Sequence, residues 1–263
     1  RTASRLGLDT VAVFTAADRS QPYLSEVTRA IDLGDGPLQA TYLSIQRILD
    51  AARFSGADAI HPGYGFLAEN ADFAQAVIDS GFTFIGPTPQ LMRELGRKDL
   101  ARAVAERCGV PVVPGYHGTD QSDEALYSEA TKIGLPLLIK AVAGGGGRGV
   151  REVNELARFR QALIEARAEA AAAFGDERVV LERLVRQVRH VEVQLIGDCH
   201  GNVVHLFERD CTAQRRRQKL IEESPAPYLP SDVREAMLMA AVQLGKGSGL
   251  TNAAGSLAVS GLT

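Results

Sequence analysis

The residues best suited to chemistry lie in a glycine-rich run and in the segment before it. The run reads Gly144-Gly145-Gly146-Gly147-Arg148-Gly149, and Lys140 lies four residues upstream of it on an otherwise apolar stretch. By letter the run matches the dinucleotide fingerprint G-x-G-x-x-G, but that fingerprint must open a helix. The residues that follow, 150–153, have the pattern of a strand. A dinucleotide site is therefore rejected for this run.

A glycine-rich hairpin tip offers a different kind of site. Its unhindered backbone N–H groups can close over phosphate oxygens, and Lys140 would add a point charge to the same phosphates. The alternative is a surface hairpin whose lysine packs its stem on apolar surface and keeps its amino group in water. Five glycines in six residues carry a high entropy cost, which favours a phosphate-binding hairpin.

A second dense group of charges lies at residues 208–223. Arg215, Arg216, Arg217 and Lys219 place four cations within five positions, and Glu208, Asp210, Glu222 and Glu223 nearly cancel them. Interleaved acids and bases favour an anion or phosphate pocket over a nucleic-acid groove, and a solvated charged face remains the alternative. Upstream, His190 has either a role in this site or a structural hydrogen bond.

Composition narrows the function classes further. Among 263 residues, 29 Lys and Arg against 32 Asp and Glu give a net charge of -3, without the basic excess of nucleic-acid-binding domains. Cys108, Cys199 and Cys211 show no zinc or redox spacing, which is typical of a reducing cytosol. No apolar run approaches the 18 residues of a membrane span. We therefore expect a cytoplasmic protein that binds neither nucleic acid nor a membrane.

The elements that must position these residues can be predicted from periodicity. Strands at 10–14, 58–60 and 82–86 alternate with helices at 42–54 and 70–80, which predicts a small doubly wound parallel sheet. Ligands on such a sheet bind beyond the carboxyl ends of its strands, where residues 61–65 would lie.

The remaining elements form a second part of the chain. One helix is predicted over 91–108, containing Lys98, followed by a helix at 123–133 and strands at 135–142 and 150–153. A helix at 154–174, with Asn154 as its N-cap, and a strand at 179–184 complete this group. Alternation at 191–196 and 203–207 predicts a β-hairpin, followed by a helix at 232–244 and a strand at 255–259. Gly245-Lys246-Gly247-Ser248 is no Walker A motif, because the glycine required upstream is absent.

In this order the motifs resemble the biotin carboxylase family of ATP-grasp enzymes. The segments that carry the resemblance, over residues 1 to about 230, are His61-Pro62-Gly63-Tyr64-Gly65-Phe66-Leu67-Ala68-Glu69-Asn70, Phe84-Ile85-Gly86-Pro87, Lys140 with Gly144 to Gly149, Arg189-His190-Val191-Glu192-Val193-Gln194, Glu208-Arg209-Asp210-Cys211, Gln214-Arg215-Arg216, Gln218-Lys219 and Glu222-Glu223-Ser224-Pro225-Ala226-Pro227.

The resemblance implies an α/β fold with two parts. A Rossmann-like N-terminal domain over 1–90, lacking its first strand, would precede a connecting helix at 91–112. An incomplete ATP-grasp fold would follow, with a glycine-rich lid subdomain at 113–184 and a truncated C-terminal subdomain at 185–263. We expect the sequence to be a piece of a longer protein, truncated at both ends.

The resemblance also implies a reaction. ATP phosphorylates bicarbonate to carboxyphosphate, and its CO₂ passes to the ureido nitrogen of biotin on a carrier domain, with Mg²⁺ in the intact enzyme. The implied partners are bicarbonate, a biotin carboxyl carrier domain, a carboxyltransferase component of acyl-CoA type, and a second copy in a homodimer. Phosphoryl transfer of this kind needs positioned positive charge more than covalent groups.

Individual roles follow from the same resemblance. Lys98, Lys140, Gly146 and Gly147 would contact the phosphates of ATP. Glu182, Arg183, Leu184 and Val185 would line the adenine site, with His190 and Gln214 near the nucleotide. Lys219 would hold bicarbonate.

Two departures from the family leave other functions open. Arg217 stands where the family usually has histidine, and a guanidinium cannot shuttle a proton near neutral pH. No acidic residue follows Gly255-Ser256, so no metal ligand is assigned and we expect the isolated chain to be nearly inactive. The alternatives are urea carboxylase or another ATP-grasp ligase, and a non-catalytic relic that binds a nucleotide or a partner.

Overall fold

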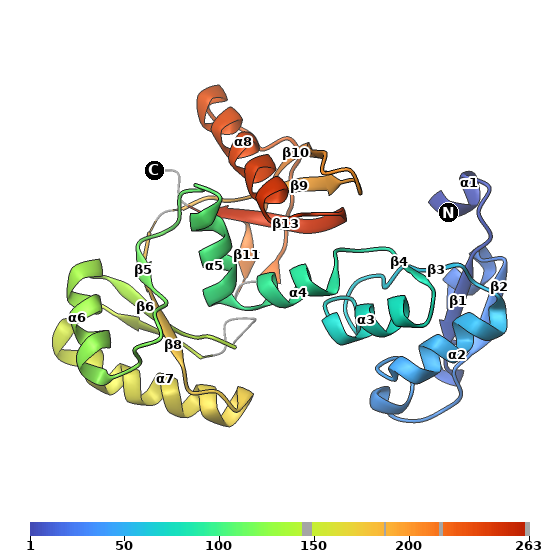
Figure 1. The fold of residues 1–263 in the computed structure, drawn as a ribbon, viewed down its shortest axis with the longest axis horizontal. Helices are drawn as coiled ribbons and strands as arrows, with labels where there is room; N and C mark the ends of the chain where they lie inside the picture. Colours follow the sequence, from blue (N-terminus) through green and yellow to red (C-terminus); the bar gives the residue numbers. More distant parts are fainter. Residues whose placement is uncertain (144–148, 187, 216–217, 261–263) are drawn as a thin grey trace. The chain divides into compact units, whose positions relative to one another are not determined.

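The computed structural model describes residues 1–143, 149–186, 188–215 and 218–260. They divide into two compact units, Arg1–Met92 and Arg93–Thr263. Figure 1 labels the helices and strands of both units. Each unit is described by itself below.

The first unit contains two parallel strand pairs. Strand β1 (Val11–Phe14) pairs with β2 (Arg29–Asp32), and β3 (Ala59–Ile60) pairs with β4 (Thr83–Phe84). The parallel arrangement was predicted, but β2 was missed because its sequence Arg-Ala-Ile-Asp has only one large apolar residue. Within residues 1–92 the two pairs form separate two-stranded ladders instead of the single sheet that was predicted.

Helices α2 (Ile45–Ser55) and α3 (Ala71–Asp79) supply the core of this unit, and the short α1 (Thr2–Arg5) buries none of its residues. The rings of Phe73 and Phe84 pack edge to face, with their centroids 6.1 Å apart, in a buried cluster with Leu49 and Val77. Asn70 caps α3 by accepting a hydrogen bond from the Phe73 amide at 2.8 Å. Such a side-chain cap satisfies one of the amides that a helix start leaves unpaired.

The single helix predicted over 91–108 is wrong, because the chain forms two helices there. Helix α4 (Pro89–Gly96) and helix α5 (Lys98–Arg107) are separated by Arg97, whose backbone is extended at φ -105° and ψ 123°. Glycine disfavours a helix interior, so Gly96 is a natural end point. Lys98 is consequently the first residue of a helix and does not lie in a helix interior.

The second unit contains a four-stranded antiparallel sheet. Its order is β5 (Gly115–Tyr116), β8 (Val179–Arg183), β6 (Leu137–Ala141) and β7 (Val150–Val153). Helices α6 (Asp123–Ile133) and α7 (Phe159–Phe174) pack on this sheet. The core between the sheet and these helices is almost fully buried, and its largest members are Leu126, Leu137, Ile139, Phe159, Leu163 and Leu181.

The prediction that α7 begins at an Asn154 cap is wrong. A short 3₁₀ turn over Leu156–Arg158 comes first, and the helix begins at Phe159 without a side-chain cap. Asn154 instead accepts a hydrogen bond from Arg186 at 2.8 Å. Its side chain is therefore used to hold the segment after β8.

A three-stranded antiparallel sheet forms the rest of the second unit, in the order β10 (Val203–Asp210), β9 (His190–Gly197) and β13 (Asn252–Ser260). The predicted hairpin of β9 and β10 is confirmed by their register. Helix α8 (Ser231–Gly247) packs on β9 and β10, and Val191 of β9 shares a buried cluster with Met237 of α8. A small hairpin of β11 (Gln214–Arg215) and β12 (Gln218–Lys219) follows β10.

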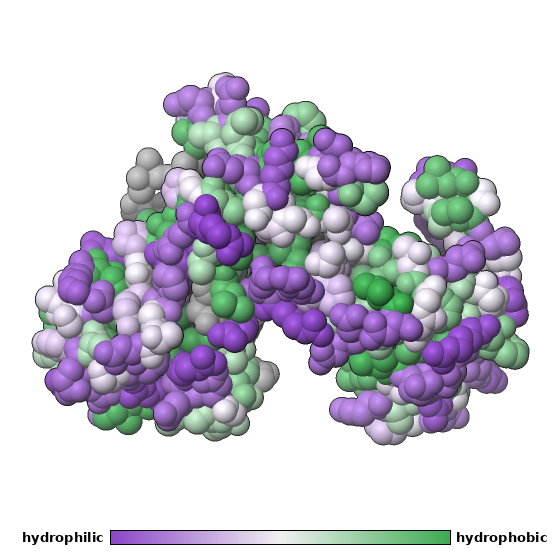
Figure 2. Space-filling view, viewed as in Figure 1, coloured by the Kyte–Doolittle hydropathy of each residue, from purple (hydrophilic) through white to green (hydrophobic). Residues whose placement is uncertain are grey.

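The surface is mixed in character. In Figure 2 hydrophilic and hydrophobic residues are interspersed over the visible face. Several large apolar side chains are exposed, among them Phe54 and Phe207. Within the described ranges, no helix is both long enough and apolar enough to cross a membrane.

Candidate functional site

Lys140 lies on the open face of the four-stranded sheet. Along β6, Leu137, Ile139 and Ala141 are buried beneath the helices, whereas Lys140 is on the opposite face. Its amino group forms an ion pair with the Glu182 carboxylate on the neighbouring strand β8, and each side chain is about one quarter exposed. The sheet thus holds the Lys140 cation in a defined place on the face opposite the buried residues of β6.

The glycine-rich run joins two antiparallel strands. Lys140 on β6 pairs in register with Val150 on β7, which confirms that the run closes a hairpin and does not open a helix. Residues 144–148, including Gly146 and Gly147, lie outside the described ranges. The predicted phosphate contacts of these two glycines remain predictions.

The backbone just after β8 contains an amide that donates to no described residue. The Leu184 amide donates to the Pro136 carbonyl at 2.9 Å, and the Arg183 guanidinium donates to the Ile133 carbonyl at 3.0 Å, at the end of α6. The side chain of Arg183 therefore supports the fold. Within the described part of the chain, the Val185 amide donates to no group, so a backbone donor is left for a ligand.

A buried carboxylate gathers the predicted residues of the other sheet. Glu192 on β9 is almost fully buried, and its carboxylate contacts His190 Nε2 at 3.0 Å, Arg209 Nη2 at 3.0 Å and the Lys219 amino group. Arg209 also contacts Glu222 at 2.9 Å. His190 and Lys219 are therefore brought together, as a single site would require.

Glu192 was not predicted as a site residue. Side chains two residues apart in a strand lie on the same face, so His190 on β9 should have drawn attention to Glu192. The apolar residues around it, Val191 and Val193, made the segment read as core.

The β11–β12 hairpin brings Gln214 opposite Lys219. The two residues are register partners, and the Gln214 side-chain amide donates to the Cys211 carbonyl at 2.8 Å. Arg217 comes between the two strands in sequence and is outside the described ranges. The structure therefore places Gln214 beside the residue predicted to hold bicarbonate.

Not all predicted residues converge on one point. Lys140 and Glu182 are on the four-stranded sheet, whereas His190, Gln214 and Lys219 are at the three-stranded sheet and its hairpin. Among the described residues, no hydrogen bond or ion pair joins the two groups. The side chain of Lys98 is not described.

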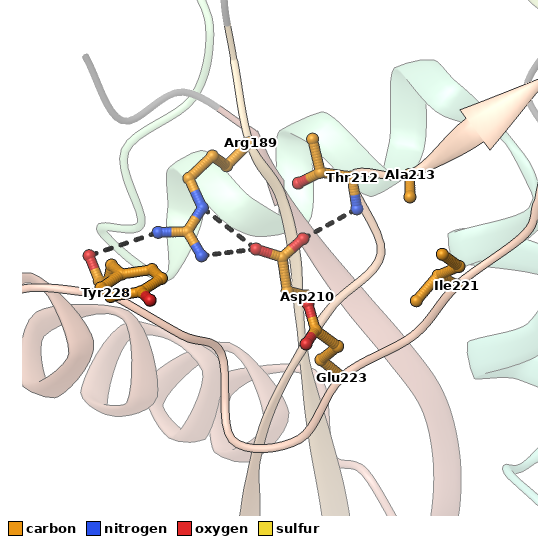
Figure 3. Close-up of a pocket in the computed structure, with 7 residues that line it drawn as sticks. All are labelled: Arg189, Asp210, Thr212, Ala213, Ile221, Glu223 and Tyr228. Atoms are coloured by element: carbon orange, nitrogen blue, oxygen red, sulfur yellow. Dashed lines mark hydrogen bonds and ion pairs between the residues drawn. The ribbon is translucent and has the colours of Figure 1, made fainter.

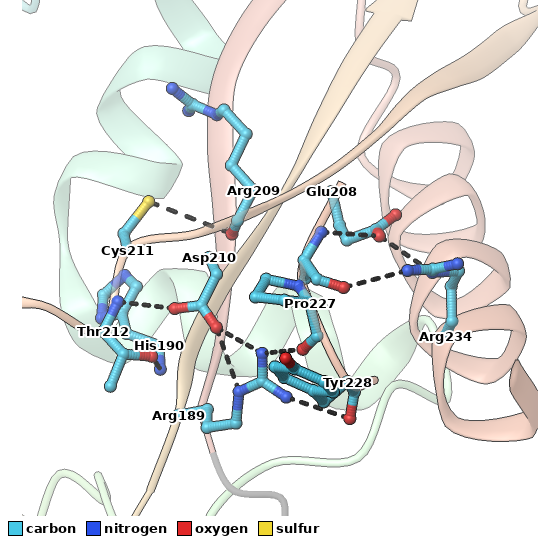
Figure 4. Close-up of polar contacts among 11 residues, drawn as sticks. Arg189, His190, Glu208, Arg209, Asp210, Cys211, Thr212, Pro227, Tyr228 and Arg234 are labelled. Carbon is cyan, nitrogen blue, oxygen red and sulfur yellow. Dashed lines mark hydrogen bonds and ion pairs between the residues drawn. The ribbon is translucent and has the colours of Figure 1, made fainter. Parts of the chain in front are cut away.

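An open cavity of about 510 Å³ lies beside the second group (Figure 3). At its centre the Arg189 guanidinium faces Asp210, with Nε at 3.0 Å, and the Thr212 amide donates to the same carboxylate at 2.8 Å. Figure 4 shows Arg189 also facing the carbonyls of Pro227 and Tyr228. Arg189 thereby ties Asp210, at the end of β10, to the segment before α8.

Two titrating groups near this cavity have shifted pKa values. Burial works to raise the pKa of Asp210, but hydrogen bonds from Thr212 and Arg189 to the charged form outweigh it, so the pKa lies below its usual value. Burial raises the pKa of the Cys211 thiol, and the neighbouring Glu192 charge adds to the effect. A buried thiol of this kind is poorly suited to act as a nucleophile.

The lowered pKa of Asp210 predicts a pH-dependent contribution to stability. Because the folded pKa is below the unfolded value of about 3.9, the contribution is complete above that value and is lost as the pH falls through the folded pKa. Asp210→Asn should lower the free energy of unfolding by about 2 kcal/mol near pH 7, and the difference should shrink below about pH 4. Urea unfolding at pH 7 and pH 3 measures both, and a pH-independent difference would contradict the assignment.

The described residues offer no evident metal site. Within these ranges, no three His, Cys, Asp or Glu side chains are grouped so that they could hold a metal ion. The carboxylates near the candidate site are instead engaged with cations, as Glu182 and Glu192 illustrate.

Two known sequence families match the chain. The family described as "Biotin carboxylase, N-terminal domain" matches residues 1–92, and the family described as "Carbamoyl-phosphate synthase L chain, ATP binding domain" matches residues 97–257. The chain is 49% identical over 253 residues to the mitochondrial methylcrotonoyl-CoA carboxylase subunit alpha of Glycine max, covering 96% of this chain and 35% of that protein. It is 44% identical to biotin carboxylase 1 of Bacillus subtilis, covering 96% and 56%.

Solved structures of biotin carboxylases are also similar to the chain. A complex of biotin carboxylase from Campylobacter jejuni with β-γ-ATP superposes with a TM-score of 0.90 at 41% identity, covering 96% of this chain and 57% of that one. The biotin carboxylase domain of Hydrogenobacter thermophilus 2-oxoglutarate carboxylase, solved with MgADP, ADP and bicarbonate, gives 0.87 at 40% identity, covering 96% and 56%. The chain thus spans between about one third and three fifths of the length of these relatives.

Proposed function

The chain belongs to the biotin carboxylase family of ATP-grasp proteins, and on that premise we propose that it supplies the nucleotide and bicarbonate sites of a biotin carboxylase. The reaction would couple cleavage of ATP to formation of carboxyphosphate, whose CO₂ is transferred to carrier-bound biotin. The observation that carries the proposal is the convergence of His190 and Lys219 on the buried Glu192, beside Gln214.

The residues divide into three roles. Lys140 and Lys98 would bind phosphates together with Gly146 and Gly147, while the segment from Glu182 to Val185 would bind the adenine base. The Val185 amide, which donates to no described residue, supports that role, because a backbone donor can pair with a base edge. Lys219 would hold bicarbonate, with Glu192 fixing its position, and Arg217 would add positive charge without moving a proton.

Mg²⁺ accompanies ADP in the Hydrogenobacter thermophilus structure, and such an ion is usually held by one or two carboxylates together with substrate phosphates. The described residues contain no group of three or more His, Cys, Asp or Glu side chains that could hold a metal ion, so no step is assigned to a metal here. Arg217 and the lack of an acidic residue at 256–260 favour a second candidate function for the isolated chain, which is nucleotide binding with little turnover. Accordingly, we expect bicarbonate-dependent ADP formation from MgATP and free biotin to stay near background, and robust turnover would contradict this.

The relatives' names support a wider assembly. A carrier domain, a carboxyltransferase component and a second copy of the chain are proposed partners, and an acyl-CoA acceptor is favoured by the similarity to methylcrotonoyl-CoA carboxylase. Urea carboxylase remains an alternative, since another domain would select the acceptor.

Nucleotide binding is the direct test of the proposal. At 100 times its dissociation constant, ADP should raise the free energy of unfolding by about 2.7 kcal/mol, because it binds the folded state alone. Urea unfolding with and without ADP measures the change, and inosine at the same concentration serves as the control. No stabilisation by ADP or ATP would overturn the proposed nucleotide site.

A further inference from the structure

Arg186 makes an unusual contact for a residue that follows the end of a strand. Its Nη2 donates to Glu152 Oε1 at 2.6 Å and to Asn154 Oδ1 at 2.8 Å. Glu152 is on β7, and Asn154 follows directly after that strand. One guanidinium nitrogen therefore bonds to a residue within β7 and to the residue directly after the strand.

The contact crosses an intervening strand. The sheet order is β5-β8-β6-β7, so β6 separates β8, which precedes Arg186, from β7. Leu138 on β6 pairs in register with Glu152 on one side and with Glu182 on the other. Neighbouring strands are about 4.8 Å apart, so the arginine links segments whose strands are roughly 10 Å apart.

This contact also fixes the backbone around Val185. On one side, the Leu184 amide is bonded to the Pro136 carbonyl at 2.9 Å. On the other side, the Arg186 side chain is bonded to Glu152 and Asn154. The Val185 amide, which donates to no group in the described ranges, therefore lies between two anchored neighbours.

We infer that Arg186 is a positioning residue for the base of a bound nucleotide. By anchoring the segment after β8, it holds the Val185 amide in place before the ligand arrives, so less ordering is left to occur on binding. This inference rests on the proposed function, since it assigns the base to the Val185 backbone. The Arg186 and Glu152 side chains are both substantially exposed, and exposed ion pairs add little to folding stability.

The test separates base binding from phosphate binding. Arg186→Met removes the hydrogen bonds but keeps most of the side-chain length, and affinities for ADP and for inorganic tripolyphosphate are measured by calorimetry. ADP binding should weaken about three- to fivefold, whereas tripolyphosphate binding changes less than about twofold. Arg160→Met is the matched control, since Arg160 is also an exposed arginine in an ion pair, with Glu124 at 3.7 Å, and it should leave both affinities unchanged.

A variant of the two residues that Arg186 contacts checks that the effect comes from this contact. Glu152→Gln combined with Asn154→Ala should reproduce the loss of ADP affinity, and adding Arg186→Met should cause no further loss. Unchanged ADP affinity in Arg186→Met, or equal loss for ADP and tripolyphosphate, overturns the inference while the proposed nucleotide site stands. Absence of ADP binding to the unaltered chain overturns both.

Discussion

Replacing Lys140 with methionine should weaken ADP binding by about 10- to 100-fold, because a charged hydrogen bond to a phosphate is worth about 1.5–3 kcal/mol. Lys140 is held on the open face of the sheet by β6 and by its contact with Glu182. It is only about one quarter exposed, so its charge is screened less than that of a surface lysine. Methionine retains the apolar stem, and the fold should remain intact.

Calorimetry with ADP measures the effect against a matched lysine. Lys132→Met is the control, since Lys132 is an exposed lysine of α6 paired with Glu129 at 2.6 Å, and its loss should change ADP affinity by less than about twofold. If Lys140→Met and Lys132→Met behaved alike, Lys140 would have no role in binding phosphate.

Much of the second unit could be predicted because its signals are local. Helix α6 has the predicted bounds, and the hairpins of β6 with β7 and of β9 with β10 were expected from strand patterns around glycine-rich turns. The resemblance to the biotin carboxylase family is confirmed by matches that together cover most of the chain. Ordered motifs identify a family even where single motifs are weak.

The errors arose where longer-range interactions decide the structure. Nothing in the apolar pattern of 91–108 marks the break at Arg97, because both helices keep the same periodicity. Asn154 looked like a helix cap, but Arg186, 32 residues later, bonds to it.

The same limit applies to the site. Glu192 contacts His190 on its own strand and two cations, Arg209 and Lys219, on other strands, and only the sheet and its hairpin bring the two cations to it. Sequence patterns identify the charged residues of such a cluster, but they do not say which carboxylate the cations share.

Glu192→Gln should therefore be the most damaging single change at the three-stranded sheet. The substitution keeps the shape of the side chain but leaves His190, Arg209 and Lys219 close together without their shared negative charge. Breaking a fully buried pair costs about 3–5 kcal/mol, and since Arg209 and Lys219 are about one third exposed, we expect a loss of about 2–3 kcal/mol of unfolding free energy. Glu155→Gln, at an exposed glutamate of a 4.0 Å ion pair, should cost less than about 0.5 kcal/mol.

A double variant distinguishes charge repulsion from lost packing. If repulsion among the cations causes the loss, adding Lys219→Met to Glu192→Gln should cost less than the sum of the two single changes, and 1 M salt should recover part of the stability of Glu192→Gln. Urea unfolding of the unaltered chain, the two single variants and the double variant, at low salt and in 1 M salt, measures these changes in unfolding free energy. Additive losses that salt does not alter would mean that Glu192 contributes through packing alone. Its proposed part in fixing Lys219 for bicarbonate would then lose its physical basis, because no electrostatic coupling would join the two residues.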